Sequence, residues 1–244
     1  NVRFSAGNYG GKQVWSPEMD VMLSSDIATL YAYYPYSTDV RDISSIPVKA
    51  SSGIQTDYMY ADPVKDLSNR NAKATVVLKH ALSAVRISVS RGTFTGPGKI
   101  TSLSVSGGNI ATEAVLDARN GMLSSIDGTG TEITVQAEIP VPAKEAASID
   151  VIVIPTGKKS EIEIKATIDG KEYTVHTEAV LLEQGKIAVF DATLNNSDMT
   201  LSSIQIDDWS YDSSGNPVIE HKWKVTLGGD ISGISFASSI EDDK

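Results

Sequence analysis

Apolar and polar residues alternate along much of this chain with the two-residue period of half-buried β-strands. The most regular segment runs from Glu161 to Ile168, where isoleucine or alanine alternates with glutamate, lysine or threonine. Asp169-Gly170 follows, and a second alternating run extends from Lys171 to Val175. Because Asp-Gly suits the two positive φ angles of a type I′ turn, these segments predict a β-hairpin.

Further strand-like runs predict an all-β fold built from β-sandwiches. Within the 74–89 run the apolar parity changes: Leu78 and Leu82 share one face, whereas Val85 and Ile87 lie an odd step away. A bulge or a switch between sheets near Ser83 would account for this change. The helical signal is limited to a turn or two at 17–25 and 143–147. The other predicted strands lie at 100–106, 131–139, 149–155, 186–194, 201–206 and 218–227.

The clearest interruption is the segment Gly92–Gly98, which contains three glycines and a proline. Such a composition resists both helix and central strand. We therefore place a domain boundary here, with an N-terminal β-sandwich at 1–95 and a C-terminal β-sandwich at 96–244. The second would include C-terminal strands and a flexible acidic end.

Composition narrows the possible functions. The chain has 244 residues, of which 41% are hydrophobic and 21% charged, as expected of a globular protein. Its net charge of -10 would repel a polyanion, so we expect no nucleic-acid partner. It has no cysteine, which excludes disulfide scaffolds, cysteine zinc sites and thiol nucleophiles.

No sequence-local catalytic or cofactor motif is present. The chain lacks a G-x-S-x-G elbow, a phosphate-binding glycine loop and an H-E-x-x-H zinc motif. Its three histidines, His80, His176 and His221, have no partner at metal-ligand spacing. We therefore predict no enzyme activity, no metal and no cofactor. A carboxylate-dependent hydrolase is the weakest alternative, because it would need two distant carboxylates facing one another in a pocket.

The order of several segments resembles the fimbrillin-like family of Bacteroidales, the subunits of type V pili. The segment from Leu78 to Val89 resembles the family's histidine-containing central strand, and the ending from Ile206 to Trp209 resembles its C-terminal domain. The matching segments, in order, are "LYAYYPYS", "IPV", "QTDYMYADPV", "VVLKHALSAVRISV", "VIVIPT", "LLEQGKIAVFDATL" and "SSIQIDDW".

This resemblance implies two tandem transthyretin-like sandwiches and a structural or adhesive role in a surface fimbria. The implied partners are other pilin subunits in a head-to-tail polymer, together with host or bacterial surface ligands. Assembly would proceed by strand addition after a trypsin-like protease removes the first strand. The implied localisation is the outer membrane and the cell-surface fimbrium, reached as a lipoprotein whose only membrane contact is a lipid anchor on the precursor. Stalk, tip and anchor roles stay open.

The resemblance also suggests particular residues. Arg3 and Arg41 are candidate processing sites. Val2 and Phe4 lie in the segment that aligns with the first strand. A second apolar stripe lies near the C-terminus, where donor or accepting strands occur in this family, although the simpler interpretation is an ordinary strand of the second sandwich. This stripe consists of Ile219, His221, Trp223, Val225 and Leu227.

The alternative function is a surface carbohydrate-binding module. Aromatic rings can stack on sugar rings, and the chain has two aromatic groups that could serve this purpose. The stacking candidates are Trp209, Tyr211, Tyr34 and Tyr36.

Overall fold

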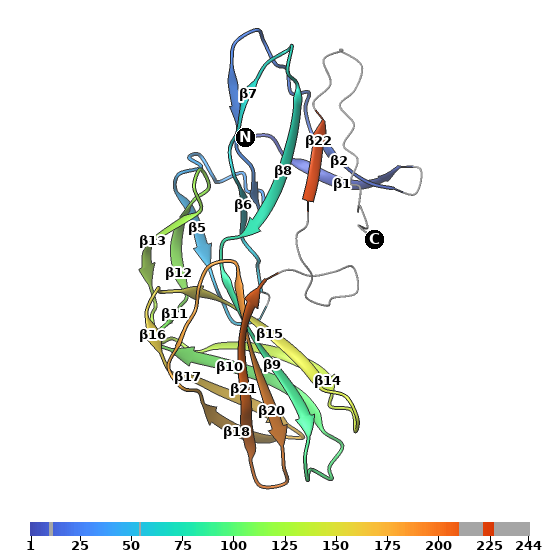
Figure 1. Cartoon of the computed structure of the whole chain (residues 1–244), viewed down its shortest axis with the longest axis vertical. Coiled ribbons are helices and arrows are strands. Elements are labelled where there is room, and N and C mark those ends of the chain that lie inside the picture. Colours follow the sequence, from blue (N-terminus) through green and yellow to red (C-terminus); the bar gives the residue numbers. More distant parts are fainter. Residues whose placement is uncertain (10–11, 54, 210–221, 227–244) are drawn as a thin grey trace.

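The computed structural model shows an all-β chain (Figure 1) and describes residues 1–9, 12–53, 55–209 and 222–226. No helix forms in these residues, so the helical turns predicted at 17–25 and 143–147 are wrong. One or two turns have too few hydrogen bonds to offset the cost of helix nucleation. The strands are β1 (Phe4–Tyr9), β2 (Lys12–Pro17), β3 (Ala28–Leu30), β4 (Tyr33–Tyr34), β5 (Ile46–Lys49), β6 (Met59–Ala61), β7 (Val64–Leu67), β8 (Lys73–His80), β9 (Ser83–Arg91), β10 (Lys99–Gly107), β11 (Ile110–Ala111), β12 (Glu113–Asp117), β13 (Met122–Asp127), β14 (Ile133–Pro140), β15 (Ala147–Pro155), β16 (Lys159–Ser160), β17 (Ile162–Ile168), β18 (Lys171–His176), β19 (Val180–Leu181), β20 (Lys186–Leu194), β21 (Met199–Asp208) and β22 (Lys222–Thr226).

Two large sheets in the lower half of Figure 1 share one apolar core, and we call them the sandwich. One sheet has the order β11-β15-β9-β20-β21 and the other has the order β14-β10-β17-β18. The alternating sequence buries every second residue along their central strands, as a two-layer fold requires. Fully buried side chains include Val85, Ile87, Val151, Phe190, Leu103, Val105 and Ile164.

The predicted hairpin is confirmed. Strands β17 and β18 pair antiparallel, with Ile168 opposite Lys171. Asp169 has φ 51° and Gly170 has φ 78°, so both central turn residues adopt the left-handed conformation that a type I′ turn needs.

The upper half of Figure 1 contains smaller sheets, which we call the upper strands. Their orders are β22-β8-β6-β4, β3-β7 and β1-β2. Among the described side chains, the buried members of their separate apolar cluster are Leu67 and Ala74. The half-buried side chains around these two are Phe4, Trp15, Leu23, Ala28, Leu30, Val64 and Ala72. Phe4 and Trp15 belong to the β1–β2 hairpin, so this hairpin forms part of the cover of the cluster.

The parity change in the 74–89 run is a switch between sheets, as predicted near Ser83. Strand β8 ends at His80 in the upper strands, and β9 begins at Ser83 in the sandwich. Ala81 and Leu82, which connect them, are fully buried. The chain therefore passes from one half of the molecule to the other through its interior.

Strand pairing crosses the expected boundary at residue 95. Strand β9 pairs with β15 and runs parallel to β20, both of which come later in the chain. Strand β5 pairs with β12 in a three-stranded sheet of order β13-β12-β5, which we call the bridging sheet. The glycine-rich segment Gly92–Gly98 connects β9 with β10, which belong to different sheets of the sandwich. Hydrogen bonding between strands thus changes partners at Ala81–Leu82 rather than at residue 95.

Candidate functional site

One edge of β8 carries β22, the described part of the C-terminal apolar stripe. The two strands pair antiparallel, with Trp223 opposite Val76 and Val225 opposite Ala74. This pairing places β22 among the upper strands instead of in the sandwich. The alternative prediction, an ordinary strand of the second sandwich, is therefore wrong for these residues. The other members of the stripe, Ile219, His221 and Leu227, lie outside the described residues.

The first strand lies apart from the other sheets. Strand β1 pairs with β2 in a two-stranded sheet. Phe4, half-buried, packs against the small Leu67 and Ala74 cluster, and Val2 is also half-buried. The hairpin therefore contributes to the apolar cluster of the upper strands.

Arg3 directly precedes β1 and is exposed. Its guanidinium carbon lies 5.9 Å from the centroid of the Tyr36 ring, within cation–π distance. Its backbone carbonyl accepts a hydrogen bond from the amide of Glu18 at 2.9 Å. Cleavage after Arg3 would leave the whole of β1 in place.

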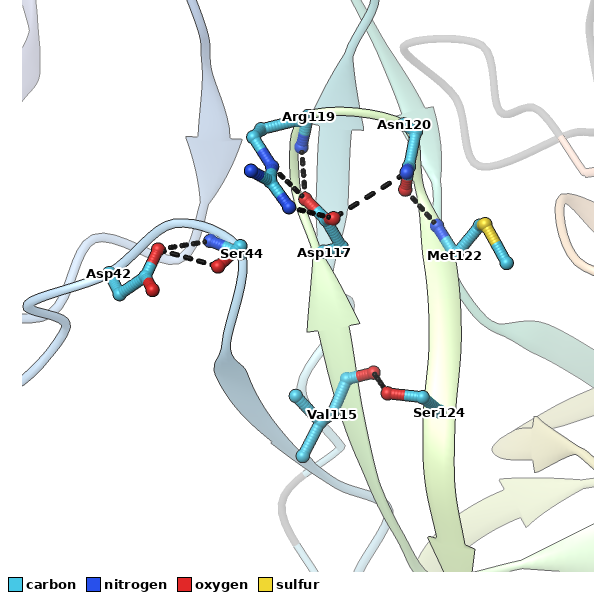
Figure 2. A network of polar contacts seen from close by, with 8 residues as sticks. All are labelled: Asp42, Ser44, Val115, Asp117, Arg119, Asn120, Met122 and Ser124. Carbon is cyan, nitrogen blue, oxygen red and sulfur yellow. Dashed lines mark hydrogen bonds and ion pairs between the residues drawn. The ribbon is translucent and has the colours of Figure 1, made fainter.

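Arg41, the second candidate processing site, is exposed in the loop before β5. The residues that follow form a tight turn, in which the backbone amide of Ser44 donates to Asp42 at 2.8 Å and its hydroxyl donates at 2.7 Å (Figure 2). These two hydrogen bonds, of which the one from the Ser44 hydroxyl has the larger effect, hold the pKa of Asp42 below its ordinary value. The turn is thereby fixed immediately after the candidate cleavage position.

The turn between β12 and β13 lies next to this loop (Figure 2). The amide of Ala118 donates to the carbonyl of Ile43 at 2.8 Å. Arg119 forms a two-pronged pair with Asp117 at 2.7 and 2.9 Å, and this pairing lowers the pKa of the Asp117 carboxyl. The loop after Arg41 is thus attached to the bridging sheet.

Trp209 is buried at the junction between the upper strands and the sandwich. Its side chain is 5% exposed, and its ring stacks on His80 with centroids 4.1 Å apart and planes 12° apart. His80 Nδ1 lies 2.7 Å from Asp57 Oδ2, and the Trp209 amide donates to the Gly185 carbonyl at 2.8 Å. We call Asp57, His80 and Trp209 the junction cluster. A ring enclosed in this way has no free face for a sugar, so Trp209 as a glycan-stacking residue is wrong.

The tyrosine candidates differ in exposure. Tyr34 is 46% exposed at the short edge strand β4, whereas Tyr36 is half-buried beside Arg3. Tyr211 lies outside the described residues. Among the described residues, Tyr34 is therefore the one well-exposed ring of the four stacking candidates.

Sequence patterns gave no indication of Gln184, which links several segments at the same junction. Its side-chain amide donates to the carbonyls of Ala81 at 2.9 Å and Gly121 at 2.8 Å. Gln184 therefore joins the sheet-switching segment to the bridging sheet. A glutamine in a short loop has no distinctive spacing, and only the tertiary arrangement reveals this role.

The described residues contain no group of three or more histidine and carboxylate side chains arranged to hold a metal ion. None of their segments forms a helix with the length and apolar character needed to span a bilayer. Asp207 and Asp208 are exposed at the end of β21, and Asp208 pairs with Lys186.

Comparison with solved structures identifies the fold. The chain is similar to a candidate cell adhesion protein from Bacteroides uniformis, with a TM-score of 0.63 and 18% identity over 86% of this chain and 91% of that one. A candidate cell adhesion protein from Bacteroides ovatus gives a TM-score of 0.60 and 19% identity over 83% and 80%. One from Bacteroides fragilis gives 0.51 and 14% over 86% and 79%.

Sequence comparison identifies the family. No curated protein sequence matches the chain. The family model described as fimbrillin-like matches residues 1–209, which span every described strand except β22. This chain therefore belongs to the fimbrillin-like family.

Proposed function

We propose that this protein is a structural and adhesive subunit of a bacterial surface fimbria and that it assembles with other subunits by strand addition. Membership of the fimbrillin-like family supports the fimbrial role. The proposed partners are other fimbrial subunits, bound head to tail. Export as a lipoprotein precursor to the outer membrane belongs to the same proposal, as do the two tandem transthyretin-like domains.

The contribution of the β1–β2 hairpin to the apolar cluster of the upper strands is the observation that supports the assembly mechanism. Among the described side chains, Phe4 and Trp15 of the hairpin pack against the buried Leu67 and Ala74. Loss of the hairpin would expose apolar side chains, and loss of β3 and β4 with it would also leave unpaired backbone groups on β7 and β6. An extended segment from a neighbour can satisfy both, so association becomes favourable without any reaction chemistry.

The pairing of β22 with β8 supports the same mechanism. It shows that the β8 edge accepts an extended segment that is distant in sequence, over five consecutive residues. Contact of a donor segment on one copy with a different surface on the next is heterologous. Such a contact repeats into a filament unless its rotation closes a ring.

The two candidate processing sites would have different consequences. Cleavage after Arg3 removes no strand, because β1 begins at Phe4. Cleavage after Arg41 separates β1 to β4 from the rest, and it exposes the edges of β6 and β7 that β4 and β3 cover. Strand addition after processing therefore favours Arg41 over Arg3.

Limited digestion with a trypsin-like protease tests this proposal. The digested chain should form polymers that are visible by electron microscopy and light scattering, with a new N-terminus at Asp42. Arg41→Ala should block both, whereas Arg3→Ala and the control Arg70→Ala, which changes an exposed arginine in the β7–β8 turn, should not. A trimmed chain that stays monomeric would argue against a stalk subunit and leave the tip and anchor roles. Polymerisation of Arg41→Ala would show that another site is used.

A further inference from the structure

The two sheets of the sandwich have four edge strands, and three of them are protected against pairing with another chain. Strand β11 has only two residues. Strand β14 is covered, because the Ser52 hydroxyl accepts from the Thr134 amide at 2.9 Å and the Gly53 amide donates to the Thr134 carbonyl at 2.9 Å. Strand β18 carries Lys171, Glu172 and His176. Short length, cover and charge are the usual means by which edges avoid association.

The fourth edge, β21, has none of these protections over most of its length. It is ten residues long, and Met199 to Ile206 contains no charged residue, proline or glycine. Among the described strands only β20 pairs with it. Every residue from Ser202 to Asp208 is exposed. This strand therefore presents a long row of backbone groups next to uncharged side chains.

Two isoleucines on β21 face the interior side of the sheet but remain uncovered. Ile204 lies opposite Phe190 and Ile206 opposite Ala188, and both partners are buried in the core. Ile204 is nevertheless 39% exposed and Ile206 43% exposed. The apolar core of the sandwich thus continues to an open edge at this end of β21.

We infer that β21 is a docking edge for β21 of a second copy of this chain, paired antiparallel about a two-fold axis normal to the sheet. Such an axis places the core-facing side of one sheet next to the core-facing side of the other. Opposite residues must therefore have the same parity, and the register centred on Gln205 places Ile204 opposite Ile206 twice per dimer. Each exposed isoleucine then gains an apolar neighbour, and the five-stranded sheets join into one.

Charge and register favour a second copy as the occupant. With Gln205 at the axis, Asp207 lies opposite Ser203 and Asp208 lies opposite Ser202, so no like charges meet. Centring on Ile206 would instead place Ile204 opposite Asp208, and centring on Asp207 would oppose two carboxylates. The Gln205 register is the one near this end of the strand that matches apolar with apolar and carboxylate with hydroxyl.

This contact differs from head-to-tail assembly, because it is isologous and uses the sandwich instead of the upper strands. It would join subunits laterally. The uncleaved chain can therefore be tested for it under conditions in which strand addition has not begun. Either the lateral contact or the proposed assembly can fail without the other.

The experiment is sedimentation velocity on the uncleaved chain and on two variants at the axis, Gln205→Lys and Gln205→Glu. Each variant brings two like charges together, and we expect dimerisation about fivefold weaker or more. An equal mixture of the two variants should restore dimers, because lysine then faces glutamate. Ser148→Lys and Ser148→Glu, at an exposed position on β15 in the same sheet, are the matched controls and should dimerise as the unmodified chain does.

Three results would overturn the inference. The unmodified chain could remain monomeric up to millimolar concentration. The Gln205 variants could dimerise as tightly as the Ser148 controls. The mixture of lysine and glutamate variants could fail to recover dimers that each variant alone has lost.

Discussion

The junction cluster should be a major source of stability, and Trp209→Ala is the direct test. Trp209 is 5% exposed, stacks on His80 and ends the family-matched segment at the point where the sandwich meets the upper strands. Truncation would remove a large buried ring and leave a cavity beside His80 and Gly185. Both halves of the molecule would lose a shared contact.

The expected cost of Trp209→Ala is about 3 to 5 kcal/mol, the usual range for removing a large buried aromatic side chain. The stack itself should account for about 0.5 to 1.5 kcal/mol of this cost. His80→Phe separates the two contributions, because it keeps an aromatic ring but loses the bond to Asp57. The Asp57 Oδ1 atom is already buried without a hydrogen-bond partner in the described structure, so we expect a further cost of about 1 to 3 kcal/mol.

Urea unfolding followed by far-ultraviolet circular dichroism would measure these free energies without depending on the fluorescence of the removed tryptophan. A double-mutant cycle between Trp209→Ala and His80→Ala would give the coupling between the rings. Tyr34→Ala, at an exposed ring, is the control and should change stability by no more than about 0.5 kcal/mol. A Trp209→Ala cost below about 1 kcal/mol, or a coupling near zero, would refute this account of the junction.

Three further predictions concern the connections between segments. Gly121→Ala should destabilise the protein by about 2 kcal/mol or more in thermal unfolding, because Gly121 has φ +76° and a Cβ there would lie 2.0 Å from Cζ of Tyr60; an unchanged melting temperature would contradict this. Gln184→Leu should cost about 0.5 to 1.5 kcal/mol in urea unfolding, since the part-buried hydrogen bonds to the Ala81 and Gly121 carbonyls are lost; equal stability would show that water replaces the amide. Asp169 accepts hydrogen bonds from the amides of Gly98 and Lys99 at 2.7 and 2.8 Å, which lower its pKa from 3.8, so its contribution should be full above pH 3.8 and lost as the pH falls through the lower folded-state pKa. The stability difference between Asp169→Asn and the unmodified chain should therefore be present at neutral pH and disappear in acid; a difference that persists in strong acid would rule out the carboxylate as its source.

Local patterns predicted the features that depend on neighbouring residues. The alternation from Glu161 to Ile168 and the Asp169-Gly170 pair define their hairpin almost completely, because strand parity and turn angles are local properties. The change of parity near Ser83 likewise indicated either a bulge or a switch between sheets, and the structure has the switch. The ordered family segments predicted the fimbrillin-like assignment.

Patterns were least informative about which strands lie together. The glycine-rich segment after Arg91 predicted a domain boundary. Strand β9 nevertheless joins β15 and β20, and the segment connects two strands within the sandwich. Trp209 follows two aspartates and was a candidate for stacking on sugars, but its neighbours in space are His80 and Asp57. Gln184 and Asp57 lie in loops without a recognisable spacing.

The sequence by itself determined the strand-rich character, the hairpin turn and the family of this protein. Only the tertiary structure decided that β9 belongs with β20, that β5 bridges to β12, that Trp209 is enclosed and that β21 remains open. The physical reason is that the two-residue period decides which face of a strand is buried but leaves its neighbours undetermined. Those neighbours are selected by packing and hydrogen bonding between segments that are far apart in the chain.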